Sequence, residues 1–240
     1  MTKMKIDIIS VVPKLLESFL FESIIKRGIE KSLVEITVYD LREWAFDKHK
    51  TVDDTPYGGG AGMIMKIDPL VAAIKDLKSR VVVNDCDNNI KTNVILTSPR
   101  GKVYNQSITN ELLNNYNHLI IICGHYKGVD ERIYNYIDNE ISIGDFILTG
   151  GEIPAAVITD SIVRLIPGVI SDIASANTDS FSSEDNSNLL DCGYYTRPLE
   201  FEGHKVPDVL ANGNHKLIEN WKKQNSLDKT RKNRPDLLEE

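Results

Sequence analysis

The sequence predicts an α/β protein built on a sheet with substantial parallel pairing. Short runs rich in Ile, Val and Leu alternate with segments of helical periodicity along the first two thirds of the chain. Continuous apolar strands of this kind are typical of sheets that helices cover on both faces. The length of 240 residues predicts one to two domains and is sufficient for a sizeable core.

Apolar runs of strand length define the expected strands. The clearest is LIIIC, which has no polar interruption and indicates a strand buried on both faces. The strands are expected at Lys5–Val12, Val34–Asp40, Arg80–Val83, Asn93–Thr97, Leu119–Cys123 and Glu140–Ile143.

The expected helices lie between these runs. Pro13 begins the first one, which extends to about Lys31, because proline is favoured in the first turn of a helix. Apolar residues then recur at helical spacing, as in Leu15, Leu16 and Phe19. The remaining helices are expected at Leu70–Ser79, Gln106–Asn115, Asp130–Tyr136 and Pro154–Leu165.

The composition changes after Gly168. Residues 171–188 are rich in Ser, Asn and Asp, which indicates a loop or an inter-domain linker. Residues 216–234 look helical and carry seven basic and two acidic side chains, a local net charge of +5. We therefore expect a first domain at 1–168, a flexible linker at 169–188 and a small, mostly helical C-terminal domain at 189–240.

Composition also excludes several classes of protein. The chain has a net charge of −7, so any binding of nucleic acid must depend on a local basic patch. Cys86, Cys123 and Cys192 are widely spaced, which suits a reduced cytoplasmic protein and forms no zinc pattern. Asp7 and Pro13 interrupt the first apolar run, and no run reaches the ~18 residues of a membrane helix, so no membrane association is expected.

Three glycine-containing loops come directly after expected strands, in residues 95–101, 122–128 and 142–151. Ligands of α/β sheets bind beyond the carboxyl ends of strands, where glycine lets the backbone approach a flat molecule. Any one loop alone could be an ordinary connection, but three together predict a shared ligand pocket. The chain has neither GxGxxG followed by a long helix nor GxxxxGK[ST], which disfavours Rossmann and P-loop nucleotide sites.

Residues 53–63 hold four glycines within five positions. This segment is either a flexible loop or a loop that becomes ordered around a ligand, and the flanking Pro56 and Tyr57 favour the second reading. The upstream residues that could hold this loop or contact a ligand are His49, Lys50 and Asp53.

Seven motifs resemble, in the same order, those of the bacterial TrmD family of tRNA (guanine-37-N1)-methyltransferases. They are DKHKTVDDTPYGGGAGMIMK, LTSPRGK, CGHYKGVDER, SIGDFILTGGE, IPGVI, DSF and YTRP. The resemblance extends from about Lys5 to Leu238. It implies a fold of the SPOUT class with a deep trefoil knot, a homodimer with shared active sites, and methyl transfer from S-adenosylmethionine to N1 of guanosine 37.

The resemblance also assigns the donor site to the three glycine loops. Most of these residues are small or apolar, as recognition of adenine by backbone groups requires. Lys127 stands where many members have Glu, so a donor contact made by that Glu is not expected here. The residues implied to hold S-adenosylmethionine are Leu96, Ser98, Pro99, Gly124, Tyr126, Ile143, Gly144, Leu148, Gly150, Gly151 and Pro154.

Guanine N1 carries a proton, so its methylation needs a base near N1 and positive charge near O6. The resemblance assigns these roles to Asp179 and Arg164. As alternatives, Asp179 caps a helix or is solvated in the linker, and Arg164 neutralises the dipole of a helix C-terminus. The resemblance further implies a requirement for Mg²⁺, although no cluster of metal ligands is visible in the sequence.

The expected partner is the anticodon stem-loop of tRNA, held by phosphate contacts from the basic C-terminal domain. The first candidates are Arg231, Lys232 and Arg234, with Lys223 and Lys229 behind them. Lys229 stands where the family tends to have Arg, and the bland alternative is a solvated helix face.

Two other functions remain open from the sequence. One is a non-catalytic RNA-binding protein that keeps the knot, and retention of Asp179, Arg164 and the glycine loops argues against it. The other is a SPOUT enzyme that acts on ribosomal RNA or on a ribose hydroxyl. The YGGGAGM loop and the basic C-terminal segment favour tRNA instead.

Overall fold

The computed structural model describes residues 3–20, 22–84, 90–170, 179–181 and 189–238, with the side chains of 82–84 left out. The chain forms two compact units, Met1–Ser171 and Asp172–Glu240. Most of the expected linker, residues 171–178 and 182–188, lies outside the described residues. The two units are therefore described separately.

The first unit contains a five-stranded sheet in the order β2-β1-β6-β5-β7. All neighbouring pairs are parallel, which confirms the predicted α/β architecture. The strands are β1 (Met4–Ser10), β2 (Val34–Asp40), β5 (Thr92–Val103), β6 (His118–Cys123) and β7 (Asn139–Ser142). A separate antiparallel pair is formed by β3 (Asp53–Asp54) and β4 (Ile64–Met65).

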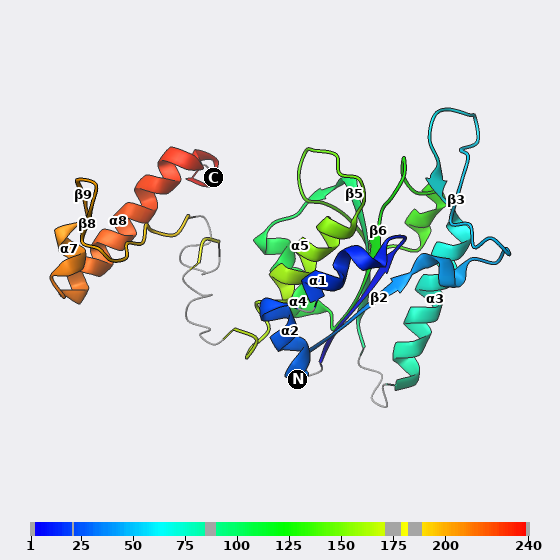
Figure 1. Cartoon of the computed structure of the whole chain (residues 1–240), viewed down its shortest axis with the longest axis horizontal. Coiled ribbons are helices and arrows are strands. Elements are labelled where there is room, and N and C mark those ends of the chain that lie inside the picture. Colours follow the sequence, from blue (N-terminus) through cyan, green and yellow to red (C-terminus); the bar gives the residue numbers. More distant parts are fainter. Residues whose placement is uncertain (1–2, 21, 85–89, 171–178, 182–188, 239–240) are drawn as a thin grey trace. The chain divides into compact units, whose positions relative to one another are not determined.

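Helices cover both faces of this sheet (Figure 1). One face packs against η1 (Pro13–Leu16), α1 (Glu17–Leu20), α2 (Ser23–Glu30), α4 (Gln106–Asn115) and α5 (Glu152–Val163). The other packs against α3 (Ile67–Asn84), with η2 (Leu41–Trp44) and η3 (Glu131–Asn135) beside it. Alternate residues of β6 serve the two cores: Ile121 faces α5 and Ile122 faces α3.

Two expected elements differ from the structure. The strand predicted at Arg80–Val83 is wrong, because α3 continues through these residues. Its β-branched run favoured a strand, but the buried positions Leu70, Ile74, Leu77 and Val81 keep the helical spacing against the sheet. The single helix predicted from Pro13 to Lys31 is divided, because Glu22 is extended (φ −128°, ψ 160°) just before α2.

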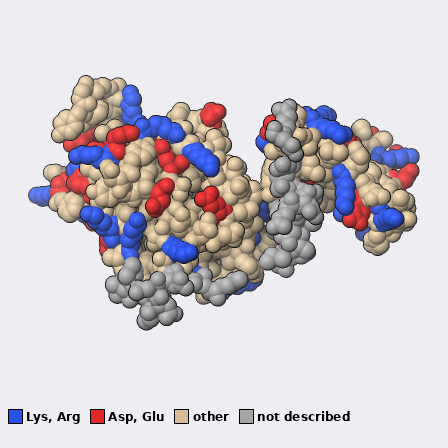
Figure 2. Space-filling view, turned by 180° about the vertical axis from the view of Figure 1, so that it is seen from behind, with Lys and Arg blue, Asp and Glu red and all other residues tan. Residues whose placement is uncertain are grey.

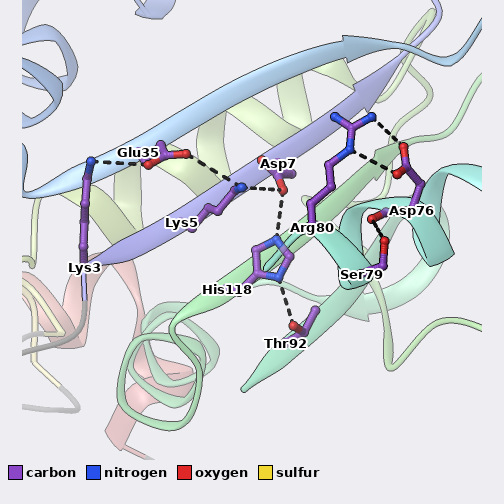
Figure 3. Close-up of polar contacts among 9 residues, drawn as sticks. All are labelled: Lys3, Lys5, Asp7, Glu35, Asp76, Ser79, Arg80, Thr92 and His118. Carbon is purple, nitrogen blue, oxygen red and sulfur yellow. Dashed lines mark hydrogen bonds and ion pairs between the residues drawn. The ribbon is translucent and has the colours of Figure 1, made fainter. Parts of the chain in front are cut away.

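A buried polar network lies where β1, β5 and β6 begin (Figure 3). The His118 side chain is 1% exposed; its Nε2 donates to Asp7 Oδ2 at 3.0 Å. Its Nδ1 lies 2.9 Å from Thr92 Oγ1, and Lys5 Nζ lies 3.6 Å from the same Asp7 oxygen. The network therefore lies at the opposite edge of the sheet from the glycine loops, which follow the carboxyl ends of the strands.

The second unit is organised around α8 (His215–Asn233). The chain before it lies along this helix, because Thr230 Oγ1 accepts from Leu190 N at 2.9 Å and Asn225 Oδ1 accepts from Gly193 N at 2.7 Å. The other described elements of this unit are the hairpin of β8 (Glu200–Phe201) and β9 (His204–Lys205), the short α7 (Asp208–Ala211) and η4 (Pro235–Leu238). No described helix of either unit is long and apolar enough to cross a membrane.

Candidate functional site

A cavity of about 490 Å³ lies at the carboxyl ends of β5, β6 and β7. This volume falls in the range of pockets that hold small organic ligands, roughly 300–1,000 Å³. The three glycine loops form its walls, and Ile64 at the end of the glycine-rich segment contributes to it. The predicted shared pocket is therefore present in the first unit.

All eleven residues implied to hold S-adenosylmethionine line this one cavity. That they contact this molecule stays a prediction, but the structure does bring them together. They are Leu96, Ser98, Pro99, Gly124, Tyr126, Ile143, Gly144, Leu148, Gly150, Gly151 and Pro154.

The first loop is a bulge inside β5. Ile141 of β7 is the register partner of both Thr97 and Lys102, so the four residues between them loop out of the ladder. Gly101 makes this possible, since a Cβ there would lie 2.4 Å from the backbone nitrogen of Ile141. The bulge places Ser98 and Pro99 on the cavity wall.

The second loop, residues 124–128, is held by the end of the glycine-rich segment. Lys127 N donates to Met63 O at 2.9 Å, and Met65 N donates to Gly128 O at 2.9 Å. Tyr126 adopts a left-handed backbone (φ 58°), which is uncommon for a residue other than glycine. Burial, followed by the charge of Asp53, raises the pKa of the Tyr126 phenol, so it is a neutral hydrogen-bonding group at physiological pH.

The third loop enters α5 by passing close to the ends of β5 and β6. A Cβ on Gly151 would lie 2.1 Å from Thr97 Oγ1 and 2.6 Å from the backbone nitrogen of Gly124. Thr97 Oγ1 in turn accepts from Gly124 N at 3.2 Å. Only glycine fits at this point, where all three loops meet.

A buried chain of hydrogen bonds, not predicted from the sequence, supports the same wall. Glu152 begins α5, is 2% exposed, and accepts from Ser10 Oγ at 2.6 Å. His125 Nε2 donates to its two oxygens at 3.0 and 2.9 Å. Burial and the charge of Glu152 also raise the pKa of the neighbouring Cys123 thiol well above its usual range. Only the place of His125 in the CGHYKGVDER motif could have indicated this chain of contacts.

Replacing Glu152 with alanine should lower the free energy of unfolding by about 3 kcal/mol, because Ser10 and His125 lose a buried partner. Glu152→Gln keeps an acceptor oxygen and should cost less. Urea unfolding measures both, with the exposed Glu111→Ala in α4 as the control. An alanine variant as stable as this control would show that the network adds nothing to stability.

The two residues assigned to catalysis do not line the cavity. Arg164 follows α5 directly, in the first unit, and is partly buried. Asp179 is also partly buried and belongs to the second unit, in the short described stretch 179–181. The structure thus assigns them to different units.

The five candidate RNA contacts lie on α8 or directly after it, and three have acidic neighbours. Lys223 pairs with Glu219 at 3.5 Å, and Arg231 lies 3.9 Å from Asp228. Arg234 Nη2 donates to Asp236 at 2.7 Å, and this contact raises the pKa of Arg234. Figure 2 shows basic and acidic side chains interspersed on the second unit, so its positive charge is partly compensated from within.

The second unit also presents aromatic side chains beside this basic helix. Tyr194 is 66% exposed, and Lys222 Nζ lies 5.7 Å from the centroid of its ring. Tyr195 packs against Trp221 with a centroid distance of 6.1 Å. Of these residues, the sequence indicated Lys222, as one of the basic residues of this helix, and Tyr195, as the first residue of the YTRP motif.

Within the described ranges, no three or more His, Cys, Asp or Glu side chains are grouped so that they could hold a metal ion. The cavity wall instead offers aliphatic, glycine and hydroxyl groups, which suit an organic ligand.

Comparison with known proteins assigns a family to this architecture. Residues 4–240 match the family described as "tRNA (Guanine-1)-methyltransferase TrmD". A protein from Ureaplasma parvum is 50% identical over 236 residues, covering 98% of this chain and 97% of the relative. One from Dictyoglomus turgidum is 48% identical, covering 98% and 90%, and one from Citrifermentans bemidjiense is 46% identical with the same coverage. All three are named tRNA (guanine-N(1)-)-methyltransferase.

Proposed function

The chain belongs to the TrmD family of tRNA (guanine-1)-methyltransferases, and we infer that it transfers a methyl group from S-adenosylmethionine to N1 of guanosine 37 in tRNA. The observation that carries this proposal is the single cavity lined by all eleven residues implied to hold the donor. S-adenosylmethionine supplies the electrophilic methyl group. The chain's own residues must bind the donor, remove a proton and hold the RNA.

The composition of the cavity wall fits the donor. Leu96, Ile143 and Leu148 offer aliphatic surface to a purine ring, and the adjoining glycines expose backbone groups to its polar edge. Tyr126, as a neutral phenol, adds a hydrogen-bond donor.

We assign proton transfer to Asp179 and stabilisation of charge on O6 to Arg164. A carboxylate can accept the N1 proton as the methyl group arrives, and a guanidinium can offset the negative charge that builds on O6. Arg164 extends the carboxyl end of α5, whose first turn closes the donor cavity. The donor cavity and Asp179 belong to different units of the chain.

We also propose the deep trefoil knot of the SPOUT class. Two contacts support it. The segment at Gly151 passes between the ends of β5 and β6. A Cβ added to Gly151 would lie 2.7 Å from the Cα of Cys123. The chain then returns from the edge strand β7 to pack α5 against the central strands β1 and β6.

A homodimer with shared sites is part of this proposal. Its support is a set of exposed apolar side chains: Phe146 and Ile147, which line the cavity, and Ile153 and Val157 on α5. Ile153 and Val157 are one turn apart on α5 and are 59% and 42% exposed. Apolar groups that cluster on the surface in this way are typical of protein interfaces.

A requirement for Mg²⁺ also remains a proposal. Among the described residues, no three or more His, Cys, Asp or Glu side chains are grouped to hold the ion. Methyl transfer with and without EDTA measures the requirement.

The anticodon stem-loop is the proposed RNA element, held by the basic side chains of α8. Replacing Arg231, Lys232 and Arg234 with alanine should weaken tRNA binding and leave donor affinity unchanged. Each lost phosphate contact should reduce the slope of log binding constant against log salt concentration by about 0.7 to 0.9. Arg234 should contribute least, because Asp236 already compensates its charge.

Binding isotherms at several salt concentrations test this patch. Lys26→Ala in α2, another exposed cation with an acidic neighbour, is the control. A triple variant with wild-type affinity and slope would remove these residues from RNA recognition.

The function as a whole is tested by methyl transfer to tRNA transcripts with guanine or adenine at position 37. We expect transfer to the guanine transcript only, at N1, together with binding of S-adenosylmethionine in calorimetry. Donor binding without transfer to either transcript would indicate another RNA substrate. No donor binding would indicate a non-catalytic protein.

A further inference from the structure

The charged side chains in the wall of the donor cavity are all positive. Among the described residues that line it, none is Asp or Glu, whereas Arg100 and Lys127 are cationic. An anionic group of a ligand would therefore meet only positive or neutral side chains there.

Arg100 already has partners of its own. Its Nη1 lies 3.3 Å from Glu131 Oε2, and its Nε lies 3.7 Å from Glu140 Oε1. Its Nη2 donates to the Tyr134 hydroxyl at 2.8 Å. Two carboxylates thus compensate the guanidinium, which leaves it little attraction for a further anion.

Lys127 is different. Its backbone is fixed, since Lys127 N donates to Met63 O at 2.9 Å, and its aliphatic stem passes over Gly62. No carboxylate of the described residues lies within 4.0 Å of its ammonium group. Lys127 therefore combines an anchored backbone, a place in the cavity wall and an ammonium group with no carboxylate partner among the described residues.

We propose that Lys127 binds an anionic group of the substrates. The group is either the carboxylate of the amino-acid tail of S-adenosylmethionine or a phosphate beside guanosine 37. A flexible ammonium suits both, because it carries three donors and needs no fixed plane of approach. The inference rests on the proposed function.

The experiment compares Lys127→Ala, Lys127→Arg and Lys127→Glu. Calorimetry uses two probes, S-adenosylhomocysteine and 5′-methylthioadenosine, which lacks the amino-acid tail and its carboxylate. Steady-state methyl transfer gives the KM for tRNA. Lys102→Ala, an exposed lysine of β5 that does not line the cavity, is the matched control.

If Lys127 binds the carboxylate, Lys127→Ala lowers the affinity for S-adenosylhomocysteine about tenfold and leaves the affinity for 5′-methylthioadenosine unchanged. If it binds a phosphate, both probes keep their affinity and the KM for tRNA rises about tenfold. In either case Lys127→Arg keeps most of the wild-type affinity or KM, and Lys127→Glu causes a larger loss than Lys127→Ala.

Two results overturn the inference. One is Lys127→Glu with unchanged affinity for both probes and an unchanged KM. The other is an equal loss for the two probes, which would mean that the loop itself is disturbed. A wild-type protein that binds neither probe would instead contradict the proposed function, so the two failures are distinguishable.

Discussion

Replacing Gly151 with alanine is expected to lower the affinity for S-adenosylmethionine by at least about 100-fold. The added methyl group would lie 2.1 Å from Thr97 Oγ1, 2.6 Å from Gly124 N and 2.7 Å from Cys123 Cα. Two of these atoms belong to the backbone and cannot turn away. Relief requires that the third loop move away from the ends of β5 and β6, which opens the cavity.

The control for this variant is Gly28→Ala in α2. Its Cβ would meet a methyl group of the Val34 side chain at 3.3 Å, which can shift, and alanine favours the helix. Calorimetry gives donor affinity, and thermal unfolding reports whether each variant is folded. A folded Gly151→Ala protein that binds the donor normally would contradict the close packing of the three loops.

The position of the cavity follows from the sequence because it depends on local signals. Apolar runs such as Leu119–Cys123 identify the buried strands, and a glycine within a few residues of each expected strand end identifies the edge where a ligand can approach. Parallel strands place these edges together, so three loops distant in the sequence meet at one site. The eleven donor-site residues carried over from the TrmD family all lie there for the same reason.

Contacts without a local signal escape prediction. Ser10 and Glu152 are separated by 142 positions, and nothing near either residue indicates the other. The register that brings β1 beside β6, and α5 onto both, decides their meeting. The prediction of a strand at Arg80–Val83 was wrong for the opposite reason. These residues have a local preference for β structure, but packing of α3 on the sheet overrides it.

Loss of the proposed base, Asp179, should separate donor binding from chemistry. We expect Asp179→Ala to bind S-adenosylmethionine nearly as well as the wild type, since the cavity lies in the first unit and Asp179 in the second. Methyl transfer in a single turnover should slow by about 100-fold or more, the usual contribution of a general base. Asp179→Asn should be equally slow, and Asp208→Asn, an exposed carboxylate of the same unit, should retain wild-type transfer.

The same variant tests whether the sites are shared between subunits. When Asp179→Ala chains are mixed with Gly151→Ala chains, each mixed dimer combines an intact cavity from one chain with an intact Asp179 from the other. If the subunits share their sites, this pair restores up to one active site per dimer, although each variant alone is inactive. If each chain uses its own Asp179, every site carries one defect and the mixture stays inactive. Native mass spectrometry establishes that mixed dimers form, so an inactive mixture that contains them would contradict the shared site.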